Sequence, residues 1–350
     1  MKTWQKLKAN PTLWEQYLIR EKVFQSIREY FKKRQFHEVQ TPTLVSIPSC
    51  EPNLEAMETK IKTARGNSQR AFLIMSPEFA IKKLLAAGIG NCFEIAKVFR
   101  NGEEVTRLHL PEFTMLEWYQ VGVNYQTMMT AVEQLFIKLS QKIRGEVDLT
   151  KWPYQGERYN ISLPWPRISI AQAFSKYAKI KTDTLVDQKA LLETAKRKNY
   201  QITPKTTWEQ AFYQIFFNEV EPQLARQKRP YFLYDYPVEQ ASLARKKKSD
   251  SRFAERFEVF FGDIELGNCF SELTDPKEQA ERFANDLNKR QKDGKSNVPI
   301  DLELIEALES GLPEVAGIAM GVDRLVMLMA NVPTIAETLT IPGKELFDLE

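Results

Sequence analysis

Two runs of alternating side chains, separated by a charged loop, constrain the fold of this chain more than any other feature. The first run spans residues 93–99 and the second spans residues 113–119. In the second run Glu117 shares a face with apolar and aromatic side chains two positions away on either side. This period of two predicts a pair of antiparallel strands joined by a long loop.

The loop between these runs carries a cation at its start. Arg100 follows the first run directly, and its guanidinium keeps its charge at every physiological pH. Glu117 lies on the second predicted strand among apolar neighbours. A permanent cation close to a buried anion predicts a site that holds a phosphate and an amine together.

A second hairpin is predicted at residues 253–261 and 263–270, with its turn at Gly262. It carries Glu258 and Glu265, which the turn is expected to bring opposite each other. Two carboxylates this close repel unless a proton or a cation lies between them. Mg²⁺ accepts oxygen ligands from carboxylates and phosphates, so the hairpin predicts a magnesium site, with exposed edge acids as the alternative.

Small residues mark a third strand. Gly317, Ala319 and Gly321 recur at every second position, which leaves one strand face bare, as a ligand lying flat on it requires. A helix is expected to follow, with Asp323 as its N-cap. Arg324 stands at the helix start, where a cation opposes the helix dipole, so stability does not explain it. Arginine at a positive helix end predicts an anion site.

Another helix start is predicted after a strand at residues 72–75. Ser76 is the expected N-cap, Pro77 the first helical residue and Glu78 an acid in the first turn. Capping alone would explain all three residues, and a binding role for Glu78 is the alternative.

The remaining segments predict helices around the strands. Apolar stripes predict helices at residues 13–33 and 125–143, and residues 276–291 predict a charged surface helix. Residues 43–68 are expected to be irregular, and a mainly helical insertion is expected at about 170–225. The helix at 13–33 either packs on the sheet or also forms a dimer interface.

Composition excludes several classes of protein. The net charge of +3 is too small to indicate nucleic-acid binding. Cys50, Cys92 and Cys269 have no paired spacing, and two histidines cannot form a histidine-rich metal site. The N-terminus lacks a signal peptide, and no run of 18 uncharged apolar residues occurs. The chain is therefore expected in the cytoplasm, without a membrane partner.

These segments together resemble the class II aminoacyl-tRNA synthetases. Residues 36–42 are similar to their motif 1, residues 99–119 to motif 2 and residues 317–328 to motif 3. The stretches at 111–119 and 268–273 look like the lysine-type enzymes. The resemblance covers nearly the whole chain. It implies an α+β fold in which an antiparallel sheet is flanked by helices, a single catalytic domain over residues 1–350, and a homodimer.

Within the class, the chain is similar to the stand-alone paralogues of lysyl-tRNA synthetase that join (R)-β-lysine to elongation factor P. Motif 1 begins near residue 20, so an anticodon-binding domain is not expected and tRNA is an unlikely partner. Stretches at 234–244 and 254–259 support the likeness, as does Ala319, where lysyl-tRNA synthetases usually have glycine. A truncated lysyl-tRNA synthetase and a non-catalytic paralogue are the alternatives.

The resemblance implies a ligase that forms an aminoacyl-adenylate from ATP with Mg²⁺, which a lysine ε-amine of elongation factor P then attacks. The expected catalytic residues are Arg100 and Arg324. ATP is expected at Arg100, Asn101, Glu103, His109, Phe113, Glu265, Leu266, Gly321 and Arg324. Lysine or (R)-β-lysine is expected at Ser76, Pro77, Glu78, Glu117, Tyr119, Asn268, Glu272 and Ala319. Magnesium is expected at Glu258 and Glu265.

Two departures from the family fall in the motif 2 loop. Gly102 lengthens the loop by one residue, so that either Gly102 or Glu103 takes the place of the family's glutamate. Leu110 stands where the family usually has asparagine, and leucine offers no side-chain hydrogen bond.

Overall fold

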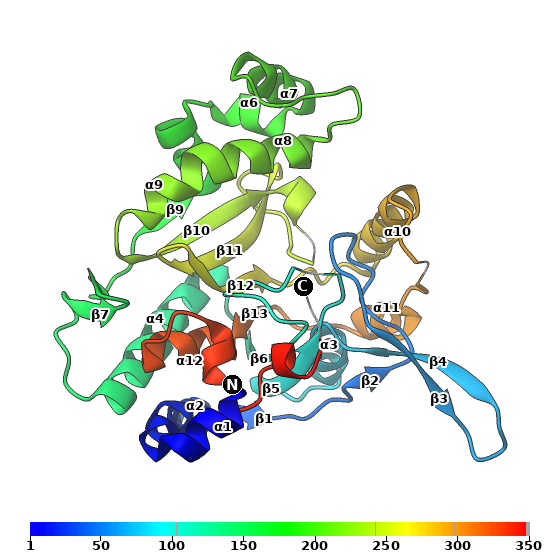
Figure 1. Cartoon of the computed structure of the whole chain (residues 1–350). Coiled ribbons are helices and arrows are strands. Elements are labelled where there is room, and N and C mark those ends of the chain that lie inside the picture. Colours follow the sequence, from blue (N-terminus) through cyan, green and yellow to red (C-terminus); the bar gives the residue numbers. More distant parts are fainter. Residues whose placement is uncertain (103, 242, 297, 348–350) are drawn as a thin grey trace.

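The computed structural model describes residues 1–102, 104–241, 243–296 and 298–347 and is built around one eight-stranded sheet (Figure 1). In spatial order its strands are β1 (His37–Glu38), β5 (Cys92–Phe99), β6 (Glu112–Val121), β13 (Val315–Gly321), β12 (Ile264–Ser271), β11 (Phe253–Phe261), β10 (Pro230–Pro237) and β9 (Arg167–Ser169). Neighbours are antiparallel except at the edges, where β1 with β5 and β9 with β10 run parallel. The hairpins β5–β6 and β11–β12 confirm both predicted strand pairs, and the α+β class is confirmed.

Three helices cover one face of this sheet. They are α2 (Trp14–Lys32), α4 (Tyr125–Arg144) and α12 (Val322–Ala330). The apolar positions of β6 that alternate away from Glu117 point toward them, and Trp118 is buried there. The ring of Phe31 from α2 stacks on Phe93 of β5 with 4.7 Å between centroids. Burying each such side chain contributes about 1.5–3 kcal/mol, which fixes this face of the sheet inward.

A second group of helices borders the other face of the sheet. It consists of α3 (Glu78–Ala86), α10 (Pro276–Lys292) and α11 (Leu302–Glu309). The prediction of α10 as a surface helix is wrong on one side, because Phe283 and Arg290 are buried against the rest of the molecule.

Part of the segment expected to be irregular forms a small sheet. Its strands, in order, are β2 (Leu44–Val45), β4 (Ser68–Leu73) and β3 (Glu58–Lys62). The β3–β4 hairpin projects from the body of the molecule in Figure 1. All five residues of β3 are exposed, so no alternation of apolar and polar side chains marks it in the sequence.

The helical segment predicted at about 170–225 connects the edge strand β9 to its parallel neighbour β10 and lies at the top of Figure 1. Its helices are α5 (Ile170–Ala173), η2 (Phe174–Ala178), α6 (Thr182–Val186), α7 (Gln188–Arg197), α8 (Trp208–Ile215), η3 (Phe216–Val220) and α9 (Glu221–Ala225). Stacked phenylalanines, among them Phe174 and Phe212, form its core with one face of β10.

Short elements complete the described chain. They are α1 (Thr3–Ala9), η1 (Pro11–Leu13), β7 (Trp152–Tyr154), β8 (Glu157–Tyr159), η4 (Val238–Gln240), η5 (Ile335–Thr338) and η6 (Gly343–Glu345). Cys50, Cys92 and Cys269 are buried free thiols, in agreement with their spacing in the sequence. Among the described residues, no helix has the length and apolarity needed to cross a bilayer.

A buried carboxylate joins three elements of the fold. Asp323, in the first turn of α12, accepts a hydrogen bond from the Thr114 amide of β6 at 2.6 Å. Its other oxygen lies 2.5 Å from the guanidinium of Arg20 on α2, which also donates to the Thr114 hydroxyl at 2.7 Å. The expected N-cap role of Asp323 is wrong, because Gly321 is the N-cap and the carboxylate points to β6 and α2.

We predict that Arg20→Ala lowers the free energy of unfolding by about 2–4 kcal/mol, because it leaves the buried Asp323 charge without its cation. Arg28→Ala is the matched control on the same helix. Arg28 pairs with Glu38 at 2.7 Å, and both side chains are well exposed, so its loss should cost less than about 1 kcal/mol. Urea unfolding followed by circular dichroism measures both, and equal losses would contradict the role given to Asp323.

Candidate active site

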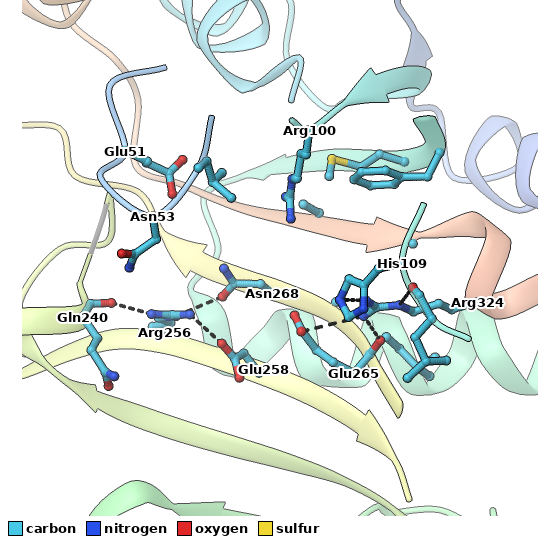
Figure 2. Close-up of a pocket in the computed structure, with 18 of the residues that line it drawn as sticks. Glu51, Asn53, Arg100, His109, Gln240, Arg256, Glu258, Glu265, Asn268 and Arg324 are labelled. Carbon is cyan, nitrogen blue, oxygen red and sulfur yellow. Dashed lines mark hydrogen bonds and ion pairs between the residues drawn. The ribbon is translucent and has the colours of Figure 1, made fainter. Parts of the chain in front are cut away.

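A pocket opens on the sheet face that α2, α4 and α12 leave uncovered, and it has two compartments. The arginine compartment contains the side chains of Arg100, Arg256 and Arg324 (Figure 2). The acidic compartment contains Glu78, Glu117 and Glu272 among its lining residues. Residues that line both compartments include Glu51, Leu54, Arg100, Met115, Asn268 and Ala319. The two compartments therefore meet at Arg100.

Arg100 lies where β5 enters the motif 2 loop. Its backbone amide donates to the Pro111 carbonyl at 2.9 Å, which closes the base of the loop. Its guanidinium carbon is 5.2 Å from the centre of the Phe113 ring, close enough for a cation–π contact. Figure 2 shows the side chain reaching from above toward β12, the strand that carries both Asn268 and Glu265. The arginine and the aromatic ring predicted for this site are thus adjacent.

Arg324 fastens the start of α12 to the neighbouring strand and loop. Its guanidinium donates to the Glu265 carbonyl at 2.6 Å and to the Leu108 carbonyl at 3.3 Å, and it lies 3.0 Å from Nε2 of His109. Because a guanidinium only donates, Nε2 accepts, and the ring proton lies on Nδ1 toward the Thr106 hydroxyl, 3.0 Å away. The structure brings His109 and Arg324 together, as the sequence predicted.

Arg256 is a cation of this pocket that sequence reasoning missed. It is buried, and it donates to Asn268 Oδ1 at 3.0 Å and to Glu258 Oε1 at 2.5 Å. Its guanidinium also lies over the Tyr236 ring at 4.4 Å. Burial lowers the pKa of Arg256, but Glu258, Tyr236, Tyr213 and Glu265 together outweigh that effect and raise it. Its position two residues before Glu258 on one strand was the available signal, since such residues share a face.

The two glutamates predicted to hold magnesium both face the arginine compartment. They do not lie directly opposite each other as expected, because Glu258 pairs with Asn268 and Glu265 with Phe260, across an irregularity between Val259 and Phe260. This bulge shifts the register by one residue and turns both carboxylates to the same face.

The donor set fits a hard cation that is also bound by a ligand's phosphates. Burial raises the pKa of Glu258, and Glu265 raises it further, so a cation between them would relieve a repulsion. Tyr236 already donates to Glu258 at 2.6 Å. Within the described residues no cluster of three or more histidine, cysteine or acidic side chains could hold a metal, so phosphate oxygens would have to complete the coordination.

Glu117 is the centre of the acidic compartment. Its two oxygens accept hydrogen bonds from the Ser76 hydroxyl at 2.5 Å and from the Tyr119 hydroxyl at 3.0 Å. Burial raises the pKa of Glu117 to about 8, and the charge of Glu78 adds to the shift. An ammonium group entering here would stabilise the ionised carboxylate.

The helix that follows Ser76 begins one residue later than predicted. Pro77 occupies the N-cap position and Glu78 is the first residue of α3. The Ser76 hydroxyl still accepts from the Glu78 amide at 3.0 Å while it donates to Glu117. The Ser76 hydroxyl therefore both caps the start of α3 and orients Glu117 in the pocket. Pro77 and Glu78 also line the acidic compartment.

Lys82 is a second missed residue, and it lies directly behind the acids. Its side chain is 2% exposed, and its ammonium is 2.6 Å from both Glu78 and Glu272. Burial raises the pKa of Glu272 to about 7, and Lys82 limits that rise. Glu272 Oε1 is buried and accepts no hydrogen bond from the described residues, although it borders the compartment. The spacing of four from Glu78 was the available signal.

The strand face predicted to be bare is only partly so. Gly317 lines the acidic compartment, but a side chain there would overlap the Tyr119 ring and Glu272 Oε1. These two side chains therefore already lie against the face at this position. A side chain added at Gly321 would meet the Arg324 side chain first, at 3.6 Å. Ala319 lines both compartments.

Several predicted residues do not present their side chains to the pocket. Asn101 is exposed and is not among the lining residues. Its backbone amide donates a hydrogen bond to the Glu55 carbonyl at 2.8 Å. The Leu266 side chain is in the hydrophobic core. Glu103 lies outside the described residues. Leu110 is buried in the same core, which explains how an apolar residue is accommodated at this place in the loop.

The segment at residues 49–55 forms a wall that sequence reasoning did not find. Glu51 lines both compartments, and burial raises its pKa while Glu78 adds and Arg100 opposes. Arg290 of α10 holds the segment by donating to the Glu51 and Leu54 carbonyls at 2.9 and 2.7 Å. The sequence of residues 49–55 is polar and contains proline, so it shows no periodic pattern of apolar side chains.

Comparison with known proteins gives a consistent result. A family model described as tRNA synthetases class II (D, K and N) matches residues 2–345. The lysine–tRNA ligase of Carboxydothermus hydrogenoformans is 33% identical over 334 residues, which are 95% of this chain and 66% of that protein. The lysine–tRNA ligase of Thermoanaerobacter pseudethanolicus is 34% identical over 333 residues, 95% of this chain and 64% of that protein. The chain thus spans slightly less than two thirds of the length of these curated relatives.

We predict that Gly317→Ala lowers the free energy of unfolding by about 1–3 kcal/mol, because the new methyl group overlaps Tyr119 and Glu272 in a packed region. Gly321→Ala, on the same strand, is the matched control. Its methyl group would meet Arg324 at an ordinary contact distance of 3.6 Å, so its effect should stay below about 1 kcal/mol. Chemical unfolding measures both variants, and an unaffected Gly317→Ala would show that Tyr119 can move aside freely.

Proposed function

Because the chain belongs to the class II (D, K and N) tRNA synthetase family, we propose that it activates lysine or (R)-β-lysine with ATP to form an aminoacyl-adenylate. The observation that carries this proposal is the position of Arg100 at the junction of two compartments, one lined also by Arg256 and Arg324 and the other lined by acids that include Glu78, Glu117 and Glu272. A phosphate in the first and an amino acid's ammonium groups in the second would meet at this guanidinium.

The nucleotide half of the proposed mechanism uses the arginine compartment. Phe113 stacks under the base, Arg324 with His109 binds the terminal phosphate, and Gly321 leaves room beside Arg324. Asn101, Glu103 and Leu266 remain expected ATP contacts from the resemblance, through main chain at Leu266. Magnesium, held by Glu258, Glu265 and the phosphates, would supply charge neutralisation at the departing pyrophosphate.

The reaction itself needs no covalent intermediate on the protein. A carboxylate oxygen of the amino acid attacks the α-phosphorus, a new P–O bond forms, and the bond to pyrophosphate breaks with its electron pair leaving on pyrophosphate. Arg100 stabilises the negative charge that grows on the α-phosphoryl oxygens. The site contributes by holding the two reactants in line, which replaces an encounter in solution.

The amino-acid half uses the acidic compartment. We propose that Glu78, Glu117 and Glu272 receive the ammonium groups and that Ser76, Tyr119 and Asn268 orient the substrate. Two curated relatives are named for lysine, a substrate with two ammonium groups, and the unpartnered Oε1 of Glu272 supports this choice. Ala319 adds a methyl group to the shared floor, where it favours a substrate whose amino group is displaced by one carbon, as in (R)-β-lysine.

The acceptor is the second part of the proposal. We propose that a lysine of elongation factor P attacks the adenylate carbonyl, forms an amide and releases AMP, in line with the resemblance and with Ala319. tRNA is the second candidate, because the curated relatives are named lysine–tRNA ligases. We further propose one catalytic domain over residues 1–350 and a homodimer formed around α2 and around β1, which lies within motif 1.

We predict that the purified chain catalyses lysine-dependent exchange between ATP and pyrophosphate, and that Arg100→Ala lowers the exchange rate by about 100-fold or more, because a transition-state cation is lost. Glu272→Gln should abolish saturation with lysine. Arg252→Ala is the control, since this exposed arginine pairs with Asp250 and Asp183 away from the pocket lining. Exchange that survives both active-site changes would contradict the mechanism.

We predict that elongation factor P, and not tRNA, becomes labelled when the chain is incubated with radiolabelled (R)-β-lysine and ATP. Elongation factor P with its acceptor lysine replaced by arginine is the control and should remain unlabelled. Labelled tRNA with either lysine isomer would support the second candidate. Exchange without any labelled macromolecule would refute both acceptors, and ATP binding without exchange would indicate a non-catalytic paralogue.

A further inference from the structure

The charges around Lys82 form a closed arrangement beneath the acidic compartment. Its ammonium is 2.6 Å from a carboxylate oxygen of Glu78, one helical turn before it, and 2.6 Å from Glu272, just after β12. All three side chains are largely buried, with side-chain exposures of 2%, 13% and 1%. Lys82 itself is not among the residues that line the compartment, so the two carboxylates separate it from an entering ligand.

Both glutamates therefore have one side toward Lys82 and another toward the compartment. Glu272 Oε2 faces the ammonium, while Oε1 accepts no hydrogen bond from the described residues and lies over Gly317. A carboxylate whose one oxygen is held by an ammonium and whose other oxygen is buried without a hydrogen bond from the described residues can gain a partner when a cation enters beside it. An apolar side chain at position 82 would leave two buried carboxylates facing each other without a counter-ion.

Other titratable groups also face this arrangement. Glu117 and Tyr119 approach from β6, and Cys269 from β12. Glu51 from the 49–55 segment acts on Glu78, and Arg100 acts on Glu51 at the junction of the compartments. Lys83 also lines the compartment, but its ammonium pairs with Asp301 and Glu303, each at 2.9 Å. Lys82 is therefore the cation that contacts Glu78 and Glu272 directly.

We propose that Lys82 is a positioning residue for amino-acid binding, which holds the carboxylates of Glu78 and Glu272 in place, so that the compartment accepts a substrate with two ammonium groups. When Glu78, Glu117 and Glu272 are all ionised, these three carboxylates and the Lys82 ammonium together carry two negative charges, which equals in size the charge on the two ammonium groups of lysine or (R)-β-lysine. The inference rests on the proposed function for the identity of the ligand.

The charge balance has a consequence for pH dependence. Burial raises the pKa of Glu272 to about 7 and that of Glu117 to about 8, so both carboxyl groups are partly protonated at neutral pH. An ammonium ligand binds the ionised form, and the amino-acid KM therefore falls as pH rises through this range. Without Lys82, the pKa of Glu272 rises further, and the same fall in KM moves to higher pH.

The test compares Lys82→Met with wild type in the amino-acid KM of ATP–pyrophosphate exchange between pH 6 and 8.5. A shift of one pH unit in the profile corresponds to an increase of about tenfold in KM at the acid end, with a much smaller difference at pH 8.5. The KM for ATP should not change. Lys97→Met is the matched control, because it removes an ion pair with Glu112 in which both side chains are about half exposed.

A double variant separates charge balance from folding. Lys82→Met with Glu78→Gln removes one charge of each sign, and such a neutral replacement of a buried pair is often tolerated. It should move the pH profile back toward that of wild type, although affinity stays reduced. Stabilisation of each variant by lysine in thermal unfolding provides a binding measurement that does not require turnover.

The possible outcomes distinguish this inference from the proposed function. A KM increased by the same factor at every pH in Lys82→Met, with no return in the double variant, would overturn the positioning role. Wild type that shows neither exchange nor stabilisation by lysine would overturn the proposed function instead. If Lys82→Met does not fold, the double variant alone decides. A pH profile of its amino-acid KM close to that of wild type supports the inference, and a profile displaced to higher pH contradicts it.

Discussion

The geometry of the site depends on the interactions that the buried carboxylate of Asp323 makes with its two partners. This carboxylate joins α12 to the middle of β6 through the Thr114 amide and to α2 through Arg20. Phe113 precedes Thr114 in the chain and Arg324 follows Asp323, and both Phe113 and Arg324 line the pocket. A single buried charge on the covered side of the sheet thus sets the distance between an aromatic platform and an anion-binding arginine on the open side.

The sheet distributes the side chains of a single strand between the two compartments. On β6, residues of one parity face the open side, so Phe113 and Glu117 fall in different compartments four residues apart. Arg100 enters from β5 between them. Because the strands are fixed by a packed core, these charges cannot relax toward one another, and a ligand with complementary groups replaces the interactions that the empty site lacks.

Sequence reasoning recovered the parts of this structure that follow from periodicity. The alternation in β5 and β6 predicted the hairpin and the face of Glu117, and the apolar stripe predicted α2. It failed where the signal is not periodic. The exposed strand β3 has no alternation, the bulge after Val259 breaks the register on which the Glu258 expectation relied, and the 49–55 segment is held by Arg290 from a distant helix. The comparisons establish the family, whereas the residue roles remain predictions.

Lys82 shows why charge pairing is the hardest feature to predict from sequence. Its neighbours Ile81 and Lys83 suggest an ordinary amphipathic helix, in which a lysine faces water. The tertiary packing reverses that expectation, because Glu272, which follows β12 and lies 190 positions later in the chain, contacts the Lys82 ammonium. Burying lysine is unfavourable unless its charge is compensated. Two carboxylates compensate it here, and each is in turn kept from repelling the other, so the pair and the lysine form one interdependent unit.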